Sequence, residues 1–182
     1  MAKVILESLN KVFTSKIGND VKAVNNFNLL LEDGEILALL GSSGCGKTTT
    51  LRMIAGFETA SSGLIKIGDR IINDLKPAER NVAMAFEGYA LYPPLTVRDN
   101  IAFSLMREKI SKEKVDSKVM EVAELLEITD ILERYPPSIS GGQQQRVSLA
   151  RALVRDSDAL LLDEPMSQLE PQLRAVLRAR VK

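Results

Sequence analysis

Residues 41–48 form a glycine-rich segment whose residue types and spacing are suited to holding phosphate groups. The sequence Gly41-Ser-Ser-Gly-Cys-Gly-Lys-Thr48 fits the pattern G-x-x-x-x-G-K-[ST]. Glycines permit a tight curl in which successive backbone N–H groups point at phosphate oxygens. Lys47 can reach the β- and γ-phosphates, and the Thr48 hydroxyl can ligate Mg²⁺. The residues predicted to contact a nucleoside triphosphate here are Gly41, Ser42, Ser43, Gly44, Cys45, Gly46, Lys47, Thr48 and Thr49.

The elements that must position this phosphate loop are predicted on both sides of it. The apolar run from Glu35 to Leu40 is typical of a fully buried parallel strand. Lys47 to Ile54 reads as a helix that Gly56 ends, and its N-terminus adds partial positive charge near the phosphates. A glycine-rich turn that binds nothing is the competing interpretation, and the flanking strand and helix disfavour it.

Two adjacent carboxylates, Asp163 and Glu164, follow the apolar run Ala159–Leu162. Parallel α/β sheets bind their ligands at the carboxyl ends of their strands. Asp163 would hold Mg²⁺, directly or through water, and Glu164 would act as general base for the attacking water. Alone, such a pair can equally be two solvated acids. Together with the phosphate loop, it forms the second half of one predicted site.

A Ser/Gly-rich segment precedes the acidic pair and resembles the signature sequence of ABC transporter ATPases. The residues that carry the resemblance are Ser140, Gly141, Gly142 and Gln143, which open a predicted helix that continues to Arg155. A hydroxyl, two glycines and a helix N-terminus can form a second anion cradle. The resemblance covers nearly the whole chain, and Ile139 stands where the family usually has leucine.

This resemblance implies a cofactor, partners and a location. The cofactors would be ATP and Mg²⁺, with two ATP molecules buried between two head-to-tail ATPase subunits. Phe13 lies where the family stacks an aromatic ring on adenine. The segment from Phe86 to Val97 resembles the region that receives a helix of an integral-membrane permease subunit. Its amino-acid sequence is most similar to the carbohydrate-importer branch of the family. A solute-binding protein would be an indirect partner, and the expected location is the cytoplasmic face of the cell membrane, bound peripherally.

The chain departs from the family pattern at several positions. Glu87 stands where the family has a glutamine that senses Mg²⁺ and the attacking water, so a negative charge is added beside Asp163 and Glu164. The resemblance implies a catalytic role for Glu87, together with Lys47 and Glu164, and a metal-binding role, together with Thr48 and Asp163. The alternative is that Glu87 points to solvent or towards the membrane partner. Ser167-Gln-Leu-Glu170 replaces the usual Ser-x-Leu-Asp. The sequence contains no histidine, although the family has a switch histidine after the next strand. We therefore expect a C-terminally truncated ATPase domain with weak or absent turnover.

The fold class expected for residues 1–182 is α/β: a P-loop NTPase core with a β-rich N-terminal edge and a helical insertion. We place the core in residues 1–87 and 156–182 and the helical subdomain at about 88–155. Val4–Leu9, Val21–Leu31, Leu64–Ile67 and Val82–Phe86 are the other predicted strands. Ser111 is predicted to cap one helix, and Arg174–Lys182 to begin another.

Composition limits the possible partners. Lys+Arg and Asp+Glu both number 24, so no net charge draws the chain to nucleic acid, and we expect no such partner. A single cysteine fits a reducing compartment. The resemblance, rather than the composition, implies an ATP-binding subunit of a solute importer, with carbohydrate as the expected solute class. A soluble ABC ATPase without a transport role and a nucleotide-binding fragment with little turnover remain the alternatives.

Overall fold

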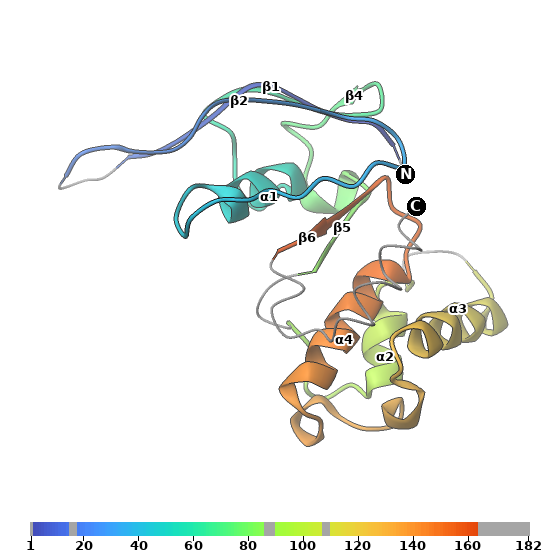
Figure 1. The fold of residues 1–182 in the computed structure, drawn as a ribbon. Helices are drawn as coiled ribbons and strands as arrows, with labels where there is room; N and C mark the ends of the chain where they lie inside the picture. The colour runs from blue at the N-terminus through green and yellow to red at the C-terminus, as the bar shows by residue number, and fades with distance from the viewer. Residues whose placement is uncertain (1, 15–17, 86–89, 107–109, 164–182) are drawn as a thin grey trace. The chain divides into compact units, whose positions relative to one another are not determined.

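The computed structural model describes residues 2–14, 18–85, 90–106 and 110–163, which fall into two compact units. The first unit runs to Val82 and takes in Ser157–Leu161, and the second begins at Ala83 and includes Asp156. Strands and one helix make up most of the first unit, and helices most of the second (Figure 1). The predicted helix at 174–182 lies outside the described residues.

A four-stranded sheet dominates the first unit, with strand order β2-β1-β3-β4. Its strands are β1 (Val4–Phe13), β2 (Val21–Leu31), β3 (Ser62–Ile67) and β4 (Arg70–Ile71). All three pairings are antiparallel, and Val4 lies opposite Leu31 on one side and Ile67 on the other. The β-rich N-terminal edge predicted from the sequence is confirmed, and β1 continues past the predicted Leu9 to Phe13.

Helix α1 (Lys47–Ala55) supplies the apolar residues that complete the core of this unit. Thr50, Met53 and Ile54 are buried at helical spacing, as expected of a helix with one face against a sheet. Helix α1 ends at Gly56, as predicted. The fully buried large side chains of the unit are Leu6, Leu9, Met53, Ile65, Ile67 and Ile72.

The prediction of a buried strand at Glu35–Leu40 is wrong. These residues have no regular secondary structure, and the side chains of Ile36 and Leu40 are 54% and 91% exposed. A strand forms only where neighbouring backbone offers hydrogen-bond partners. Among the described residues no strand pairs with this segment, so its apolar composition alone does not make it a strand.

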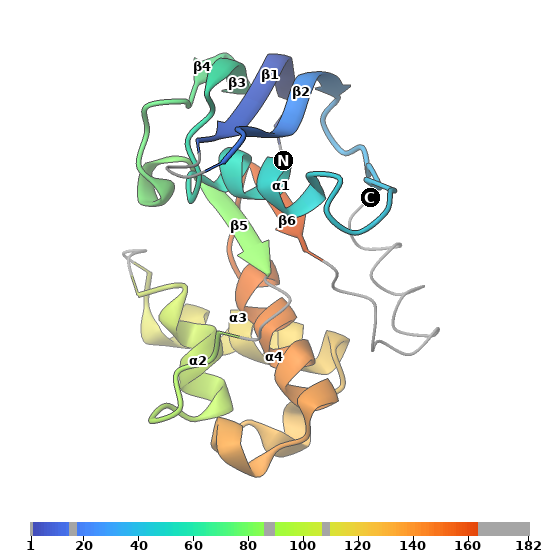
Figure 2. The ribbon, with the colours of Figure 1, turned by 90° about the vertical axis from the view of Figure 1, so that its left-hand side faces the viewer.

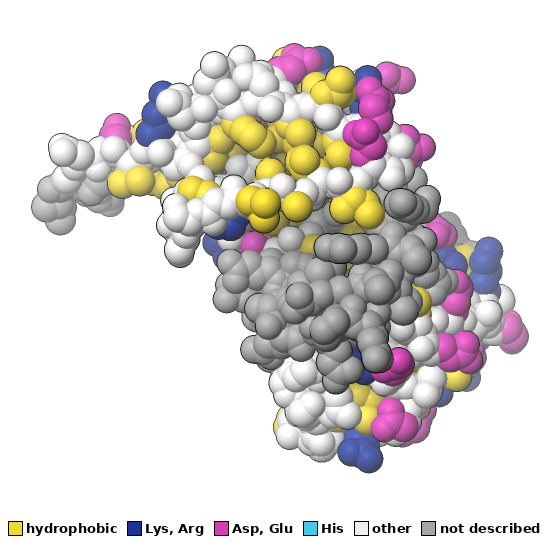
Figure 3. Space-filling view, in the orientation of Figure 1, with side chains coloured by type: hydrophobic (Ala, Val, Ile, Leu, Met, Phe, Trp, Pro, Cys, Tyr) yellow, Lys and Arg dark blue, Asp and Glu magenta, His cyan; other side chains and the backbone are white. Residues whose placement is uncertain are grey.

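In a space-filling view, hydrophobic side chains gather on the surface of the first unit (Figure 3).

Two further predicted strands are confirmed as β5 (Val82–Ala85) and β6 (Ala159–Leu162), which form a two-stranded sheet. The amide of Asp158 donates to the carbonyl of Asn81 at 2.9 Å, and the amide of Asp163 donates to that of Ala85 at 3.1 Å. These bonds join the two strands at both ends, and they fix Asp163 directly after the last residue of β6.

In the described part of the second unit the α-helices are α2 (Val97–Phe103), α3 (Lys112–Leu125) and α4 (Gly141–Leu153) (Figure 2). Each begins at a hydroxyl N-cap whose side chain accepts from a backbone amide, and the caps are Thr96, Ser111 and Ser140. Short 3₁₀ turns occur at Pro77–Glu79 in the first unit and at Thr129–Ile131 and Pro136–Ser138 in the second. No helix among the described residues combines the length and apolar character needed to cross a bilayer.

The C-terminal end of α1 is held by a buried arginine. The Arg80 guanidinium donates to the carbonyls of Met53 at 2.7 Å, Ile54 at 3.0 Å, Leu75 at 2.8 Å and Asn73 at 2.9 Å. Arg80 is 3% exposed, and burial lowers its pKa, an effect that nearby Asp74 opposes. A Cβ atom added at Gly56 would lie 2.6 Å from the Arg80 Nε. Arg80 thus satisfies the last carbonyls of α1, and Gly56 leaves it room.

We expect Arg80→Met to destabilise the protein by on the order of 3 kcal/mol, because it leaves two buried and two part-buried carbonyls without their donor. Chemical denaturation measures this change. Arg52→Met is the matched control, because Arg52 lies on the same helix with an exposed side chain. Equal stability of the two variants would contradict a structural role for Arg80.

Candidate functional site

The phosphate loop is an exposed turn in which Lys47 points back at the loop that precedes it. Lys47 Nζ donates to the carbonyls of Gly41 at 2.9 Å and Ser42 at 3.0 Å. It also lies 3.8 Å from the Cys45 Sγ atom. Gly44 and Gly46 have positive φ angles of 81° and 94°. The loop therefore encircles an ammonium group at the N-terminus of α1.

Gly46 lies in close contact with strand β2. A Cβ atom there would be 2.3 Å from the carbonyl oxygen of Ala23. The β1–β2 register shifts at this point, since Lys11 pairs with Val24 and Val12 with Lys22, which leaves Ala23 between the paired residues. Such irregularities bend a strand and frequently occur beside functional sites. Residue 46 must therefore be glycine both for its backbone conformation and for its distance from β2.

The helix that follows the loop begins without a side-chain cap. Gly46 is its N-cap residue in a left-handed conformation, and as a glycine it provides no side-chain cap. The Thr50 amide and hydroxyl both bond to the Gly46 carbonyl, at 2.8 and 2.9 Å. Thr48 and Thr49 occupy the first turn. This N-terminus has the partial positive charge and glycine-rich approach typical of phosphate-binding helices.

A pocket of about 320 Å³ lies between the phosphate loop and strand β2. It falls within the usual size range of small-molecule sites. Its lining combines one stretch of β2, the two leucines that precede the loop, the loop itself and the first turns of α1. It consists of Lys22, Ala23, Val24, Asn25, Phe27, Leu39, Leu40, Cys45, Gly46, Lys47 and Thr50.

Phe13 lies at the end of β1, opposite Val21. Val21 immediately precedes Lys22, the first pocket residue of β2. The Phe13 side chain is 41% exposed, and the Lys11 ammonium lies 4.8 Å from the centre of its ring. The structure thus places an exposed aromatic ring next to the strand that lines the pocket.

The signature residues lie at the N-terminus of α4, in the second unit. The Ser140 hydroxyl accepts from the Gln143 amide at 3.3 Å, and the Gln143 side chain accepts from the Ser140 amide at 3.0 Å. This reciprocal capping box fixes the first turn of α4. Gly141 and Gly142 stand in that turn, and a Cβ atom at Gly142 would meet nothing within 4 Å.

Asp163 is 6% exposed at the end of β6. Glu164 and Glu87 lie outside the described residues, so the catalytic and metal-binding roles given to them stay predictions. The phosphate loop belongs to the first unit and Asp163 to the second, so their joint site is also a prediction. Among the described residues, no three His, Cys, Asp or Glu side chains form a metal-binding group.

Two residues to which the sequence analysis gave no structural role, Asn100 and Arg151, hold the segment 90–96 in place. Asn100 is fully buried: its side-chain oxygen accepts from the Tyr92 amide at 2.8 Å, and its NH₂ group donates to the carbonyls of Tyr92, Leu95 and Thr96. Arg151 of α4 donates to the Ala90 carbonyl and lies 4.9 Å from the Tyr92 ring. Burial lowers the Arg151 pKa, and Tyr92 opposes this.

Sequence comparison identifies a family for the chain. The sequence model of the ABC transporter family matches residues 24–167. The chain is 45% identical over 182 residues to the sn-glycerol-3-phosphate import ATP-binding protein UgpC of Brucella abortus (strain 2308), covering all of this chain and 51% of that protein. It is 50% identical over 188 residues to the trehalose/maltose import ATP-binding protein MalK of Thermococcus litoralis, covering all of this chain and 49% of that protein. The chain thus spans about half the length of these relatives.

A solved structure gives the same result for the fold. The ATP-binding cassette MJ0796, determined as a dimer in a post-hydrolysis state bound to ADP and Pi, superposes with a TM-score of 0.85 and 29% identity. The match covers 96% of this chain and 79% of that one. The α/β fold with a P-loop NTPase core predicted from the sequence is confirmed.

We expect Gly46→Ala to destabilise the protein more than Gly44→Ala. Both residues have positive φ, which costs alanine about 1–2 kcal/mol. A Cβ atom at Gly46 meets the Ala23 carbonyl at 2.3 Å, whereas one at Gly44 meets nothing within 4 Å. Thermal denaturation of both variants isolates the steric contribution. If the two melting temperatures fall equally, the contact with β2 does not determine residue 46.

Proposed function

This chain belongs to the ABC transporter family, and on that basis we propose that it is the ATP-binding part of a solute importer's motor. The observation that carries the proposal is the position of Lys47. Its ammonium lies inside a glycine-rich loop at the start of α1 and is held by two carbonyls of that loop. An anionic phosphate oxygen is a stronger acceptor than a carbonyl, so a bound triphosphate would draw the ammonium to itself.

The proposed ATP site uses the pocket beside β2. Residues 41–49 would surround the phosphates, and the α1 N-terminus would add its partial positive charge. The Phe13 ring, exposed next to the strand that lines the pocket, would stack on the base. Base stacking on an aromatic ring and binding of the phosphates by backbone amides are independent contacts, so each can be tested separately.

The donor set proposed for Mg²⁺ consists of hard oxygen atoms. Mg²⁺ prefers oxygen ligands and is usually bound by one or two protein groups together with substrate phosphates. The Thr48 hydroxyl in the first turn of α1 and the Asp163 carboxylate fit this chemistry. Bound Mg²⁺ would neutralise charge on the phosphates. Thr48 and Asp163 would each contribute an oxygen, with Glu87 as a further carboxylate ligand.

Hydrolysis would require groups beyond the phosphate loop. Glu164 follows Asp163 directly and is proposed as the general base that takes a proton from the attacking water. Lys47 would stabilise negative charge that develops on the γ-phosphate. The Ser140–Gln143 segment would contact the γ-phosphate bound to a second ATPase subunit in a head-to-tail dimer. The dimeric state of MJ0796 supports such an arrangement.

Coupling to transport is proposed from the relatives and from the sequence resemblance of the segment Phe86–Val97. Relatives along the whole chain are import ATP-binding proteins for sn-glycerol-3-phosphate and for trehalose and maltose. We propose that the chain acts peripherally at the cytoplasmic face of a membrane with permease subunits and, indirectly, a solute-binding protein. A carbohydrate or a related polyol derivative is the proposed solute class. Co-purification with a membrane subunit would distinguish this function from that of a soluble ABC ATPase.

We expect Lys47→Ala to weaken Mg-ATP binding severely, by at least about 100-fold, because it removes a charged donor from the phosphate site. Isothermal titration calorimetry measures this directly. Lys3→Ala is the control, because it removes an exposed lysine of the same unit whose partner is Glu32. Unchanged affinity in Lys47→Ala would contradict the assignment of the loop as the phosphate site.

We expect Glu87→Gln to make ATP affinity less dependent on Mg²⁺. A carboxylate at this position is a stronger metal ligand than an amide, but it adds a third negative charge beside Asp163 and Glu164. The variant should therefore lose less ATP affinity than the parent when Mg²⁺ is removed. ATP titrations at several Mg²⁺ concentrations test this, and superimposable curves would place Glu87 away from the metal.

A further inference from the structure

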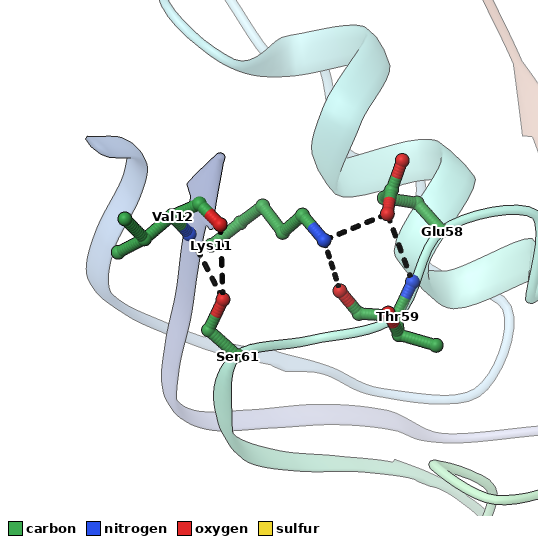
Figure 4. A network of polar contacts seen from close by, with 5 residues as sticks. All are labelled: Lys11, Val12, Glu58, Thr59 and Ser61. Carbon is green, nitrogen blue, oxygen red and sulfur yellow. Dashed lines mark hydrogen bonds and ion pairs between the residues drawn. The ribbon is translucent and has the colours of Figure 1, made fainter. Parts of the chain in front are cut away.

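A buried lysine lies beneath the ring of Phe13. Lys11 is 8% exposed, which is unusual for a charged side chain in a strand. Its Nζ atom donates to Glu58 Oε1 at 2.7 Å and to the Thr59 carbonyl at 2.8 Å (Figure 4). Both acceptors lie in the loop just after α1. Lys11 therefore links strand β1 to the end of the helix that follows the phosphate loop.

The backbone between Lys11 and Phe13 is fixed by the same loop. The Ser61 hydroxyl accepts from the Val12 amide at 3.0 Å and donates to the Val12 carbonyl at 3.4 Å (Figure 4). Glu58 Oε1 also accepts from the Thr59 amide at 3.3 Å. Loop 58–61 thus holds the Lys11 side chain and the Val12 backbone together, and Phe13 is the next residue.

The charges around Lys11 are balanced. The hydrogen bond from Lys11 lowers the pKa of Glu58, so this carboxylate is ionised at neutral pH, and Arg52 adds a smaller effect in the same direction. The ammonium lies 4.8 Å from the centre of the Phe13 ring, within cation–π range. Because the cation lies over one ring face, the exposed part of Phe13 is left for a ligand to stack on.

We propose that Lys11 is a positioning residue for the nucleobase, which holds the Phe13 ring so that one face is covered by the ammonium and the other takes the base. This inference rests on the proposed ATP function. Phe13 pairs with Val21, and Val12 pairs with Lys22, which lines the pocket. Lys11 acts through the ring, so its loss affects ligands that carry a base and spares those that carry phosphates alone.

The experiment uses a single indole fluorophore in the whole chain. The protein contains no tryptophan, so Phe13→Trp places one reporter at the ring position. The probes are Mg-ATP and Mg-tripolyphosphate, which share phosphates but differ in the base. Lys11→Met removes the ammonium and keeps an apolar stem. Lys66→Met is the matched control, because Lys66 also bonds a glutamate at 2.7 Å in the same sheet.

We expect Mg-ATP to quench the indole fluorescence of Phe13→Trp, and adding Lys11→Met to weaken that binding about fivefold, on the scale of a partly desolvated cation–π contact. Tripolyphosphate affinity, measured by calorimetry without the reporter, should be unchanged in Lys11→Met. The anisotropy of the reporter without ligand should fall when Lys11→Met is added and stay constant when Lys66→Met is added. Adding Lys11→Met to Phe13→Leu should lower ATP affinity no further.

Three outcomes would overturn the inference. An equal loss of ATP and tripolyphosphate affinity in Lys11→Met would mean that Lys11 acts through the fold as a whole. Unchanged ATP affinity and anisotropy would mean that the ammonium does not position the ring. If the parent chain binds tripolyphosphate but Phe13→Leu does not weaken ATP binding, Phe13 does not take the base. Failure of the parent chain to bind either probe would instead refute the proposed function itself, and the inference with it.

Discussion

The geometry of the phosphate loop depends on backbone contacts that fix both ends of α1. At its start, Gly46 lies so close to the Ala23 carbonyl that no side chain fits between them. At its end, Arg80 donates to the carbonyls of Met53 and Ile54. Of the residues that make these contacts, only Gly46 is expected to touch a phosphate. Because Lys47 is the first residue of α1, its position follows from contacts that the sheet and the buried arginine impose on the helix.

The features that were correctly predicted are those whose signals are local in sequence. The Ser111 cap, the helix that opens at Ser140–Gln143, the Gly56 stop and the apolar strands β3, β5 and β6 each carry a signal within a few consecutive residues. Glu35–Leu40 has an equally clear apolar pattern, but a strand also needs backbone partners from elsewhere in the chain. The strand prediction for Glu35–Leu40 is therefore wrong because amino-acid composition does not show whether a neighbouring strand supplies hydrogen-bond partners.

The site residues divide in the same way. The phosphate loop and the signature segment are contiguous motifs, so they could be found by pattern. Lys11 and Glu58 lie 47 residues apart, and Arg80 and Met53 lie 27 apart. A lysine in an exposed-looking strand pattern is normally solvated, and nothing near Lys11 in sequence indicates that it is buried. Such residues become visible only once the fold brings their partners together.

The two predicted phosphate contacts are built differently, and the difference has a chemical consequence. Helix α1 begins at a left-handed glycine with no side-chain cap, whereas α4 begins at Ser140, whose hydroxyl already accepts from the Gln143 amide. A phosphate at α4 must compete with that hydroxyl for the amide, whereas the N-cap of α1 is a glycine, which has no side chain to compete. The N-terminus of α1, with Lys47 beside it, is therefore the stronger anion site within one chain. The α4 end is suited to adding a contact to a phosphate that another site already holds, as the proposed head-to-tail dimer requires.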